Sequence, residues 1–153
     1  MGDPSPAGEP GGQETGPLIW DHVGLNVADL DATAAWYIRA LGLRLENEFR
    51  VPHADLRGKM LVHQSGFRLE LIQRPGATAG IQAANPAEAA LTRGLGHFAV
   101  QVPDLDMAYE RLIAAGAAPR VPPGDAPRAG ARMAWVADCE GNLIEMITTR
   151  IHR

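Results

Sequence analysis

The sequence predicts an α+β domain built from two tandem βαβββ modules whose strands form a cupped, pseudo-twofold mixed sheet. The main observation is an internal repeat, because a shift of 75 residues carries His22 onto His97 and Glu70 onto Glu145. Within each repeat, segments that alternate apolar and polar residues surround one segment with helical spacing. The length of 153 residues fits one domain made of two half-domains that share a core.

The first repeat begins with a predicted strand over residues 18–27. His22 and Asn26 lie on one face of this strand, and valine and leucine side chains lie on the other. Asp29 then begins a helix that carries an apolar stripe, and Gly42 ends it. Three extended segments complete the βαβββ order, at residues 43–50, 58–64 and 67–73.

The second repeat follows the same order. A strand over residues 97–102 places His97 and Gln101 on one face. Asp104 begins the second helix, and Gly116 ends it. The remaining strands are expected near residues 118–122, 133–137 and 142–148.

The domain organisation follows from the repeat. Residues 1–16 are rich in Gly, Pro and Glu, which predicts a flexible N-terminal tail. The domain itself is expected over residues 17–149, with modules at 18–73 and 96–149. Residues 74–95 form a linker rich in Ala, Gly and Pro, which could contain a short helical turn and could fold over the site as a flap.

Composition excludes several classes of function. The net charge of −4 and the scattered Lys and Arg residues argue against a nucleic-acid partner. No apolar run is long enough to span a membrane, and no signal peptide is visible, so a cytoplasmic protein is expected. The single Cys139 is interpreted as a passive residue in a reducing compartment.

Four residues of metal-ligand type occupy matched positions in the repeats: His22, Glu70, His97 and Glu145. In each module the His and the Glu are predicted on the sheet face opposite the helix. If the modules pair by pseudo-twofold symmetry, the four side chains converge in one cup. Imidazole nitrogens and carboxylate oxygens suit a divalent ion such as zinc, nickel, cobalt, manganese or iron, and four protein ligands leave open positions for substrate oxygens.

The motifs DHVGLNVADLD, RLELIQRPG, GHFAVQVPDLD and GNLIEMI resemble the vicinal oxygen chelate superfamily over residues 18–149. The resemblance implies paired βαβββ modules and a metal held by the four residues named above. Members that cleave catechol rings or open fosfomycin use only two His and one Glu, which correspond to His22, His97 and Glu145. The additional Glu70 resembles the glyoxalase I and epimerase arrangement, in which the ion is redox-silent. Members that sequester bleomycin-type drugs lack the ligands.

The favoured function is therefore a divalent-metal-dependent lyase or isomerase that transfers a proton beside the carbonyl of a small oxygenated substrate. Glu145, or its counterpart Glu70, is the expected base. A metal-dependent dioxygenase or thiol transferase and a small-molecule (antibiotic) sequestering protein remain alternatives. The resemblance implies a homodimer, and the sequence leaves open whether the site lies within one chain or is shared between two. The candidate substrate contacts are Asn26, Gln101, Trp135 and Arg132.

Overall fold

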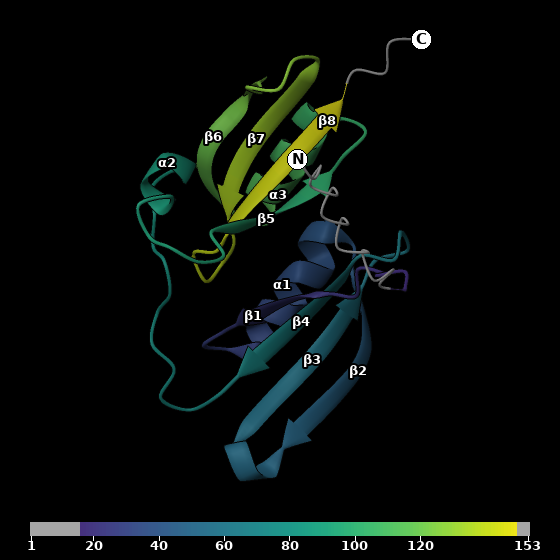
Figure 1. Ribbon diagram of the computed structural model, residues 1–153, viewed down its shortest axis with the longest axis vertical. Coiled ribbons are helices and arrows are strands. Elements are labelled where there is room, and N and C mark those ends of the chain that lie inside the picture. Colours follow the sequence, from purple (N-terminus) through teal and green to yellow (C-terminus); the bar gives the residue numbers. More distant parts are fainter. Residues whose placement is uncertain (1–15, 150–153) are drawn as a thin grey trace, which may run out of the picture.

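The computed structural model describes residues 16–149 and has the predicted α+β architecture (Figure 1). Two four-stranded sheets follow one another along the long axis of the molecule, and each sheet belongs to one module. The strands thus form two separate mixed sheets related by the repeat. The predicted tail, residues 1–16, lies outside the described residues except for Gly16.

The first module contains one helix, four strands and a short 3-10 turn. In chain order these are β1 (Val23–Asn26), α1 (Leu30–Leu41), β2 (Arg44–Val51), the 3-10 turn (Pro52–Ala54), β3 (Leu56–Val62) and β4 (Arg68–Gln73). The strand order in space is β1-β4-β3-β2. Strand β1 runs parallel to β4 and the other neighbours are antiparallel, so the first and last strands of the module lie side by side.

The second module repeats this topology. Its elements are β5 (His97–Gln101), α3 (Leu105–Ala114), β6 (Ala118–Asp125), β7 (Ala131–Ala137) and β8 (Leu143–Thr149), with the spatial order β5-β8-β7-β6. Strand β5 runs parallel to β8. The predicted strand over 18–27 is shorter in the structure, and the predicted loop before β7 is partly strand, because β6 extends to Asp125.

Both helices begin where the sequence predicts. Asp29 accepts hydrogen bonds from the backbone of residues 31 and 32, and Asp104 accepts one from that of residue 107. These carboxylates satisfy N–H groups that have no partner inside the helix. Gly42 ends α1 with φ of 68°, a left-handed conformation that glycine adopts without a steric penalty.

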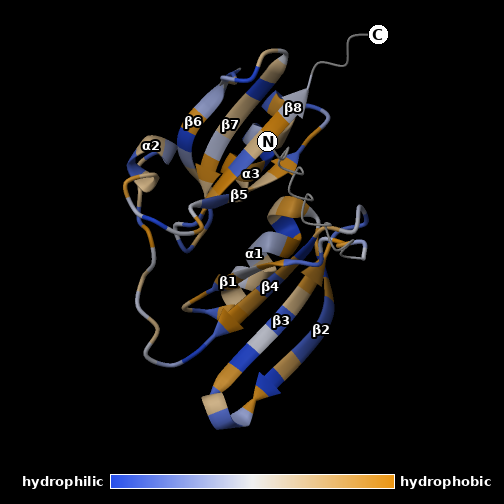
Figure 2. Ribbon diagram, in the orientation of Figure 1, coloured by the Kyte–Doolittle hydropathy of each residue, from blue (hydrophilic) through white to orange (hydrophobic). Residues whose placement is uncertain are grey.

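The alternation along the strands determines which face each side chain occupies. In β4 the side chains of Leu69 and Leu71 are fully buried against the helix, while Glu70 between them lies on the opposite face and is partly exposed. Figure 2 shows polar residues in the first half of β3 and an apolar run in its second half. The face opposite the helix is called the site face here.

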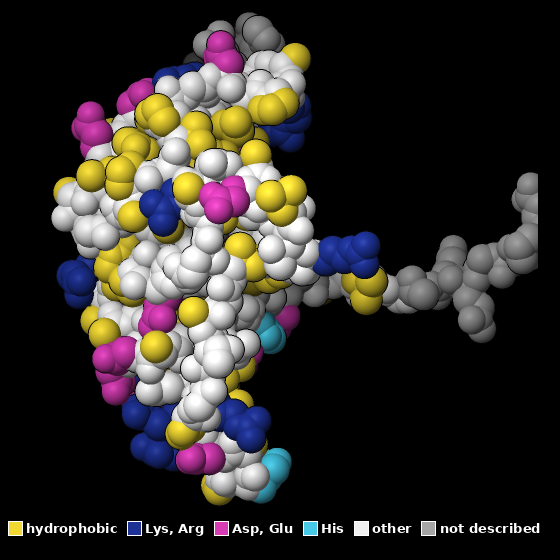
Figure 3. Space-filling view, turned by 90° about the vertical axis from the view of Figure 1, so that its left-hand side faces the viewer, with side chains coloured by type: hydrophobic (Ala, Val, Ile, Leu, Met, Phe, Trp, Pro, Cys, Tyr) yellow, Lys and Arg dark blue, Asp and Glu magenta, His cyan; other side chains and the backbone are white. Residues whose placement is uncertain are grey.

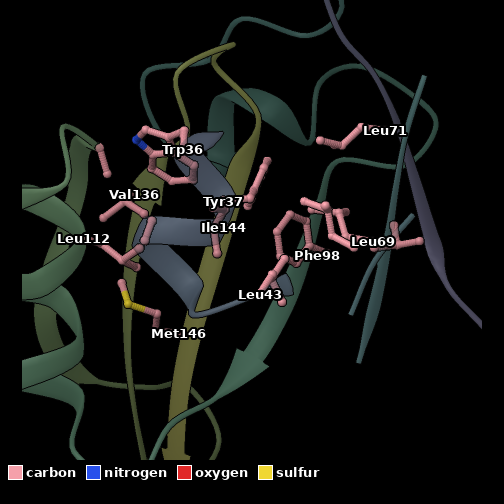
Figure 4. Packing of buried hydrophobic residues seen from close by; sticks show 14 of the residues in the cluster. Trp36, Tyr37, Leu43, Leu69, Leu71, Phe98, Leu112, Val136, Ile144 and Met146 are labelled. Carbon is pink, nitrogen blue, oxygen red and sulfur yellow. The ribbon is translucent and has the colours of Figure 1, made fainter. Parts of the chain in front are cut away.

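One hydrophobic core joins the two modules. Its largest members come from both, and Figure 4 shows residues of β4, β5, β7 and β8 packed around α1. The ring of Tyr37 on α1 lies 4.8 Å from Trp36 and 6.3 Å from Phe98 of the second module, measured between ring centroids. The module arrangement is therefore built on buried aromatic contacts as well as chain connectivity.

Polar contacts fix the same interface. The buried hydroxyl of Tyr37 donates to Asp138 at 2.5 Å, and the indole of Trp36 donates to the carbonyl of Ala115 at 2.9 Å. Glu140 accepts from the hydroxyl of Thr33 and from the backbone N–H groups of residues 28 and 29. Burial, and after it the charge of Asp138, raises the pKa of Tyr37 well above its ordinary value.

The linker packs on the second module. It contains the short helix α2 (Pro86–Ala89), which starts after Asn85 as predicted. Ala83 and Ala89 of this linker pack in a small apolar cluster with Trp135 and Leu143 on the site face of the second sheet. The linker therefore covers part of that face. Within residues 16–149, no helix is long and apolar enough to cross a membrane.

Candidate metal centre

The first pair of predicted ligands lies on the site face of the first sheet. His22 immediately precedes β1, and Glu70 lies in the neighbouring strand β4. The His22 Nε2 atom is 3.6 Å from the Glu70 Oε2 atom, and the two side chains are 36% and 21% exposed. A Cβ atom at Gly24, the register partner of Glu70, would lie 3.4 Å from the carboxylate, at van der Waals contact.

The second ligand pair has the same geometry. His97 begins β5 and Glu145 lies in the parallel neighbour β8, with Nε2 and Oε2 again 3.6 Å apart. The two side chains are 43% and 17% exposed. The repeat therefore reproduces the position of each ligand type and also the separation of the two donor atoms.

The donor atoms of each pair fit one divalent ion. Two donors that each lie about 2.1 Å from an ion are separated by roughly 3.0–3.4 Å at bond angles of about 90–109°. The observed 3.6 Å is close to that span and too long for a hydrogen bond. Neutral imidazole and carboxylate also form the ligand chemistry expected for first-row ions.

The two pairs remain separate within the chain. Across residues 16–149, no three His, Cys, Asp or Glu side chains come close enough together to hold an ion. The four-ligand convergence expected from pseudo-twofold pairing is therefore not formed inside one chain, because the modules pack through α1 and the shared core. Figure 3 shows the molecule hollowed along one long edge, with histidine side chains on that edge.

Different neighbours support the two histidines. Asp21 Oδ1 lies 2.7 Å from the Nδ1 atom of His22, and Arg68 binds Asp21 on one side and Glu46 on the other. The hydrogen bond with His22, and to a smaller extent the charge of Arg68, lowers the pKa of the Asp21 carboxyl. The His22 ring is thus linked through Asp21 and Arg68 to Glu46 in a network of charged side chains.

His97 has an aromatic neighbour in place of a carboxylate. Its ring lies 4.6 Å from that of Trp135, edge to face, and Trp135 is buried with its indole N–H directed to the sulfur of Met133. Trp135 is the cross-strand partner of Glu145, so it lies on the site face. Trp135, a predicted substrate contact, therefore touches the predicted ligand His97.

The other predicted substrate contacts are distributed unevenly. Asn26 and His97 both line a cavity of ≈ 440 Å³ between β1, the linker and the start of β5. Gln101 is exposed in β5, on the same face as His97. Arg132 lies three residues before Trp135 in β7, so it occupies the opposite face, and it is ion-paired with Asp106 of α3 at 2.7 Å. A substrate contact by Arg132 therefore stays a prediction, without the support of a position on the site face.

Two supporting residues were missed by the sequence reasoning: Asp21 and Arg68. The signal was present for Arg68, because alternation places it on the same face as Glu70. Asp21 carried a weaker signal, since neighbouring residues of an extended chain normally point to opposite faces. Asp21 precedes β1, and there its side chain turns back to the ring of His22.

Comparisons with known proteins agree with this fold. Residues 19–146 match the model of the Glyoxalase/Bleomycin resistance protein/Dioxygenase superfamily. The chain is 27% identical over 129 residues to lactoylglutathione lyase GLX1 of Arabidopsis thaliana, covering 82% of this chain and 42% of that protein. The chain thus spans less than half the length of that relative.

Solved structures show the same architecture. A glyoxylase/bleomycin resistance protein/dioxygenase domain from Frankia sp. EAN1pec superposes with a TM-score of 0.72 at 24% identity, covering 90% of this chain and 96% of that one. Glyoxalase I from Zea mays superposes with a TM-score of 0.67 at 24% identity, covering 83% of this chain and 43% of that one. With the family match over most of its length, the chain belongs to the Glyoxalase/Bleomycin resistance protein/Dioxygenase superfamily.

Proposed function

We propose that the protein is a divalent-metal-dependent lyase or isomerase of the glyoxalase I type. The observation that carries the proposal is the pair of matched His–Glu contacts, each with donor atoms 3.6 Å apart. A set with two carboxylates, Glu70 and Glu145, favours this chemistry over a dioxygenase, for which two His and one Glu suffice. The similarity to a lactoylglutathione lyase supports the same choice.

The complete site is proposed to form between two copies of the chain. A protein site for a divalent ion usually supplies at least three ligands, and each module supplies two. A twofold axis would bring the first pair of one chain against the second pair of its partner and form two equivalent sites. Exposed apolar residues support such an interface, since Trp20 and Leu95 each lie two residues before a ligand His and are 76% and 70% exposed.

The chemistry follows from the donor set. A divalent ion bound by His22, Glu70, His97 and Glu145 would polarise a substrate carbonyl as a Lewis acid. Glu145 then acts as the base and takes the proton from the carbon beside that carbonyl, for which it must lie within roughly 2.6–3.2 Å of the donor atom. The carboxylic acid returns this proton to the former carbonyl carbon, and the proton of the substrate hydroxyl moves to the former carbonyl oxygen, so the substrate is isomerised with no change in its atoms. Glu70 can exchange roles with Glu145 by the repeat symmetry.

The proposed substrate class is the hemithioacetal of a 2-oxoaldehyde and a thiol. This class offers two adjacent oxygens and an acidic C–H, as the mechanism requires, and the name of the Arabidopsis relative indicates a related thioester product. Asn26 and Trp135 are proposed to line the substrate site, since Asn26 borders the cavity beside His97 and Trp135 contacts the His97 ring.

Metal content and turnover together test the proposal. Protein purified without added metal should carry close to one equivalent of nickel, cobalt, zinc or manganese per chain by elemental mass spectrometry, and should isomerise a hemithioacetal. Glu145→Gln and Glu70→Gln should lower kcat by about 10²–10⁴-fold if the carboxylate is the base. Glu110→Gln, in an exposed position on α3, is the matched control.

Three outcomes would contradict the proposal. Bound iron with oxygen uptake would favour a dioxygenase. Protein that takes up no metal on reconstitution, yet binds a small molecule, would favour a sequestering protein. Unchanged turnover in both Glu variants would remove the carboxylate base from the mechanism.

A further inference from the structure

The carboxylate of Asp21 makes a short contact with the ring of His22. The Asp21 Oδ1 atom lies 2.7 Å from Nδ1, and a carboxylate can only accept a hydrogen bond, so the ring nitrogen must be protonated. When neutral imidazole carries its proton on Nδ1, the Nε2 lone pair is free. That Nε2 atom is the one that faces Glu70.

Arg68 holds Asp21 in this position. Its Nη1 atom lies 3.0 and 2.9 Å from the two Asp21 carboxylate oxygens, and its Nε atom donates to Glu46 at 3.0 Å. Arg68 is two residues before Glu70 in β4, so the same strand carries a ligand carboxylate and the group that braces the other ligand. The Asp21 side chain is 63% exposed, and the ion pair with Arg68 restricts a rotamer that would otherwise be free.

The second module lacks this arrangement. At the 75-residue shift, Gly96 stands in place of Asp21 and buried Leu143 in place of Arg68. His97 therefore has no neighbouring carboxylate in the preceding position. The contact between Asp21 and His22 is therefore specific to the first module, because the repeat-equivalent residues of the second module cannot form it.

We propose that Asp21 is a positioning residue for the metal ligand His22, and that Arg68 braces it. The inference rests on the proposed function, because it assigns Asp21 a role toward the ion that His22 would hold. The Asp21 carboxylate fixes the ring orientation and the Nδ1–H tautomer before metal arrives. Loss of the carboxylate leaves the ring free to rotate and to place its proton on the ligand nitrogen.

The first test reads the tautomer directly in metal-free protein. Long-range ¹H–¹⁵N correlation spectra, with His22 assigned by the His22→Gln variant, should show the Nδ1–H tautomer of the neutral ring in the unaltered chain. Asp21→Ala should shift the His22 signals toward the Nε2–H form and leave those of His97 in place. Unchanged His22 signals would overturn the inference.

The second test measures zinc affinity by chelator competition. Asp21→Ala should weaken binding by about 10–100-fold, the usual cost of losing a group that orients a ligand. Asp31→Ala is the control, because Asp31 forms an exposed ion pair with Lys59 elsewhere on the module and should leave the affinity within about twofold. Asp21→Asn, whose amide oxygen can still accept a hydrogen bond from Nδ1–H, should have a zinc affinity between those of Asp21→Ala and Asp31→Ala.

The affinities also separate the two proposals. If the unaltered chain binds zinc and His22→Ala does not, the metal site stands, and equal affinities of Asp21→Ala and Asp31→Ala would then contradict the positioning role alone. If the unaltered chain binds no zinc, the proposed function fails and the role of Asp21 toward a ligand fails with it.

Discussion

The two candidate half-sites, one in each module, share a His–Glu pair and differ in almost everything around it. In the first module the His–Glu pair is adjoined by charged groups, with Asp21 on the imidazole and Arg68 on Asp21. In the second module the same positions hold Gly96 and Leu143, and Trp135 packs against the imidazole. The linker also packs there, since Ala83 and Ala89 join the apolar cluster of Trp135.

This difference shows that the position of each His–Glu pair does not depend on the residues that contact the histidine ring. The His–Glu separation of 3.6 Å is the same in both modules, so strand register alone reproduces it. The support can be ionic or apolar, because either one restricts the imidazole ring. Metal affinity is therefore expected to depend on charged neighbours in the first half-site and on packing in the second.

The largest expected effect comes from the ligands themselves. His22→Ala and His97→Ala should each abolish stoichiometric metal binding, because each removes one donor from both of the sites formed between two chains. Elemental mass spectrometry of the purified variants measures this loss. His53→Ala, which removes an exposed histidine outside both pairs, should keep the full metal content. Full metal in either ligand variant would break the equivalence of the two half-sites.

A change of packing should affect the second half-site next most strongly. Trp135→Ala removes a buried ring from the linker cluster and should lower the free energy of unfolding by about 3–5 kcal/mol. It should also weaken metal binding by roughly tenfold, since the His97 ring loses the contact that orients it. Trp135→Phe keeps an aromatic edge and should restore much of both quantities. Denaturant unfolding and zinc titration measure them, and unchanged zinc affinity in Trp135→Ala would refute the support role.

The contact between the modules gives a smaller effect with a defined pH dependence. Tyr37→Phe removes the hydrogen bond to Asp138 and should cost about 1.5–3 kcal/mol of stability at neutral pH. The pKa of Tyr37 is raised in the folded chain, so its neutral hydroxyl stabilises the fold up to the ordinary tyrosine pKa of about 10.

Above that pH the unfolded chain ionises first. The free energy of unfolding should then fall as pH rises toward the folded-state pKa, with a contribution of up to about 1.4 kcal/mol per pH unit from Tyr37. The fall should be less steep in Tyr37→Phe when both proteins are unfolded by denaturant between pH 9 and 11. Parallel curves for the two proteins would contradict the assignment.

The smallest expected effect comes from introducing a carboxylate before His97, at the position equivalent to Asp21. Among residues 16–149, no atom outside the adjacent residues lies within 4 Å of a Cβ placed at Gly96, so Gly96→Asp introduces a carboxylate before His97 without a clash. The His97 ring should shift toward its Nδ1–H tautomer, and zinc affinity should rise a few-fold at most, because Leu143 provides no cation to hold the new carboxylate. A lower affinity would show that the two kinds of support are not interchangeable.

The sequence predicted the fold well because the repeat and the strand alternation are local signals. The caps at Asp29 and Asp104, the glycine stop at residue 42 and the opposite faces of Leu69 and Glu70 all agree with the structure. The predicted first strand was too long, since residues before Val23 have no strand partner. The convergence of the four predicted ligands in one cup was predicted from the repeat symmetry. That convergence also depends on how the two modules pack, which the repeat does not specify.

The site could be predicted only in part. Each His–Glu pair follows from parallel neighbours in one sheet, which the repeat specifies. The distance between the pairs depends on contacts between modules, such as Tyr37 with Asp138, which have no counterpart at the shifted positions Leu112 and His63. Arg132, expected in a loop before the strand, lies inside β7, where alternation turns its side chain toward α3.

Complementation between the two ligand variants tests the shared site most directly. His22→Ala and His97→Ala chains, co-expressed with different tags and purified as the mixed dimer, would bring an intact first pair of one chain against an intact second pair of the other. The account predicts that this dimer recovers about half the metal of the unaltered dimer, with one complete site and one doubly defective site. A mixed dimer as empty as the two parent variants would contradict a site shared between chains.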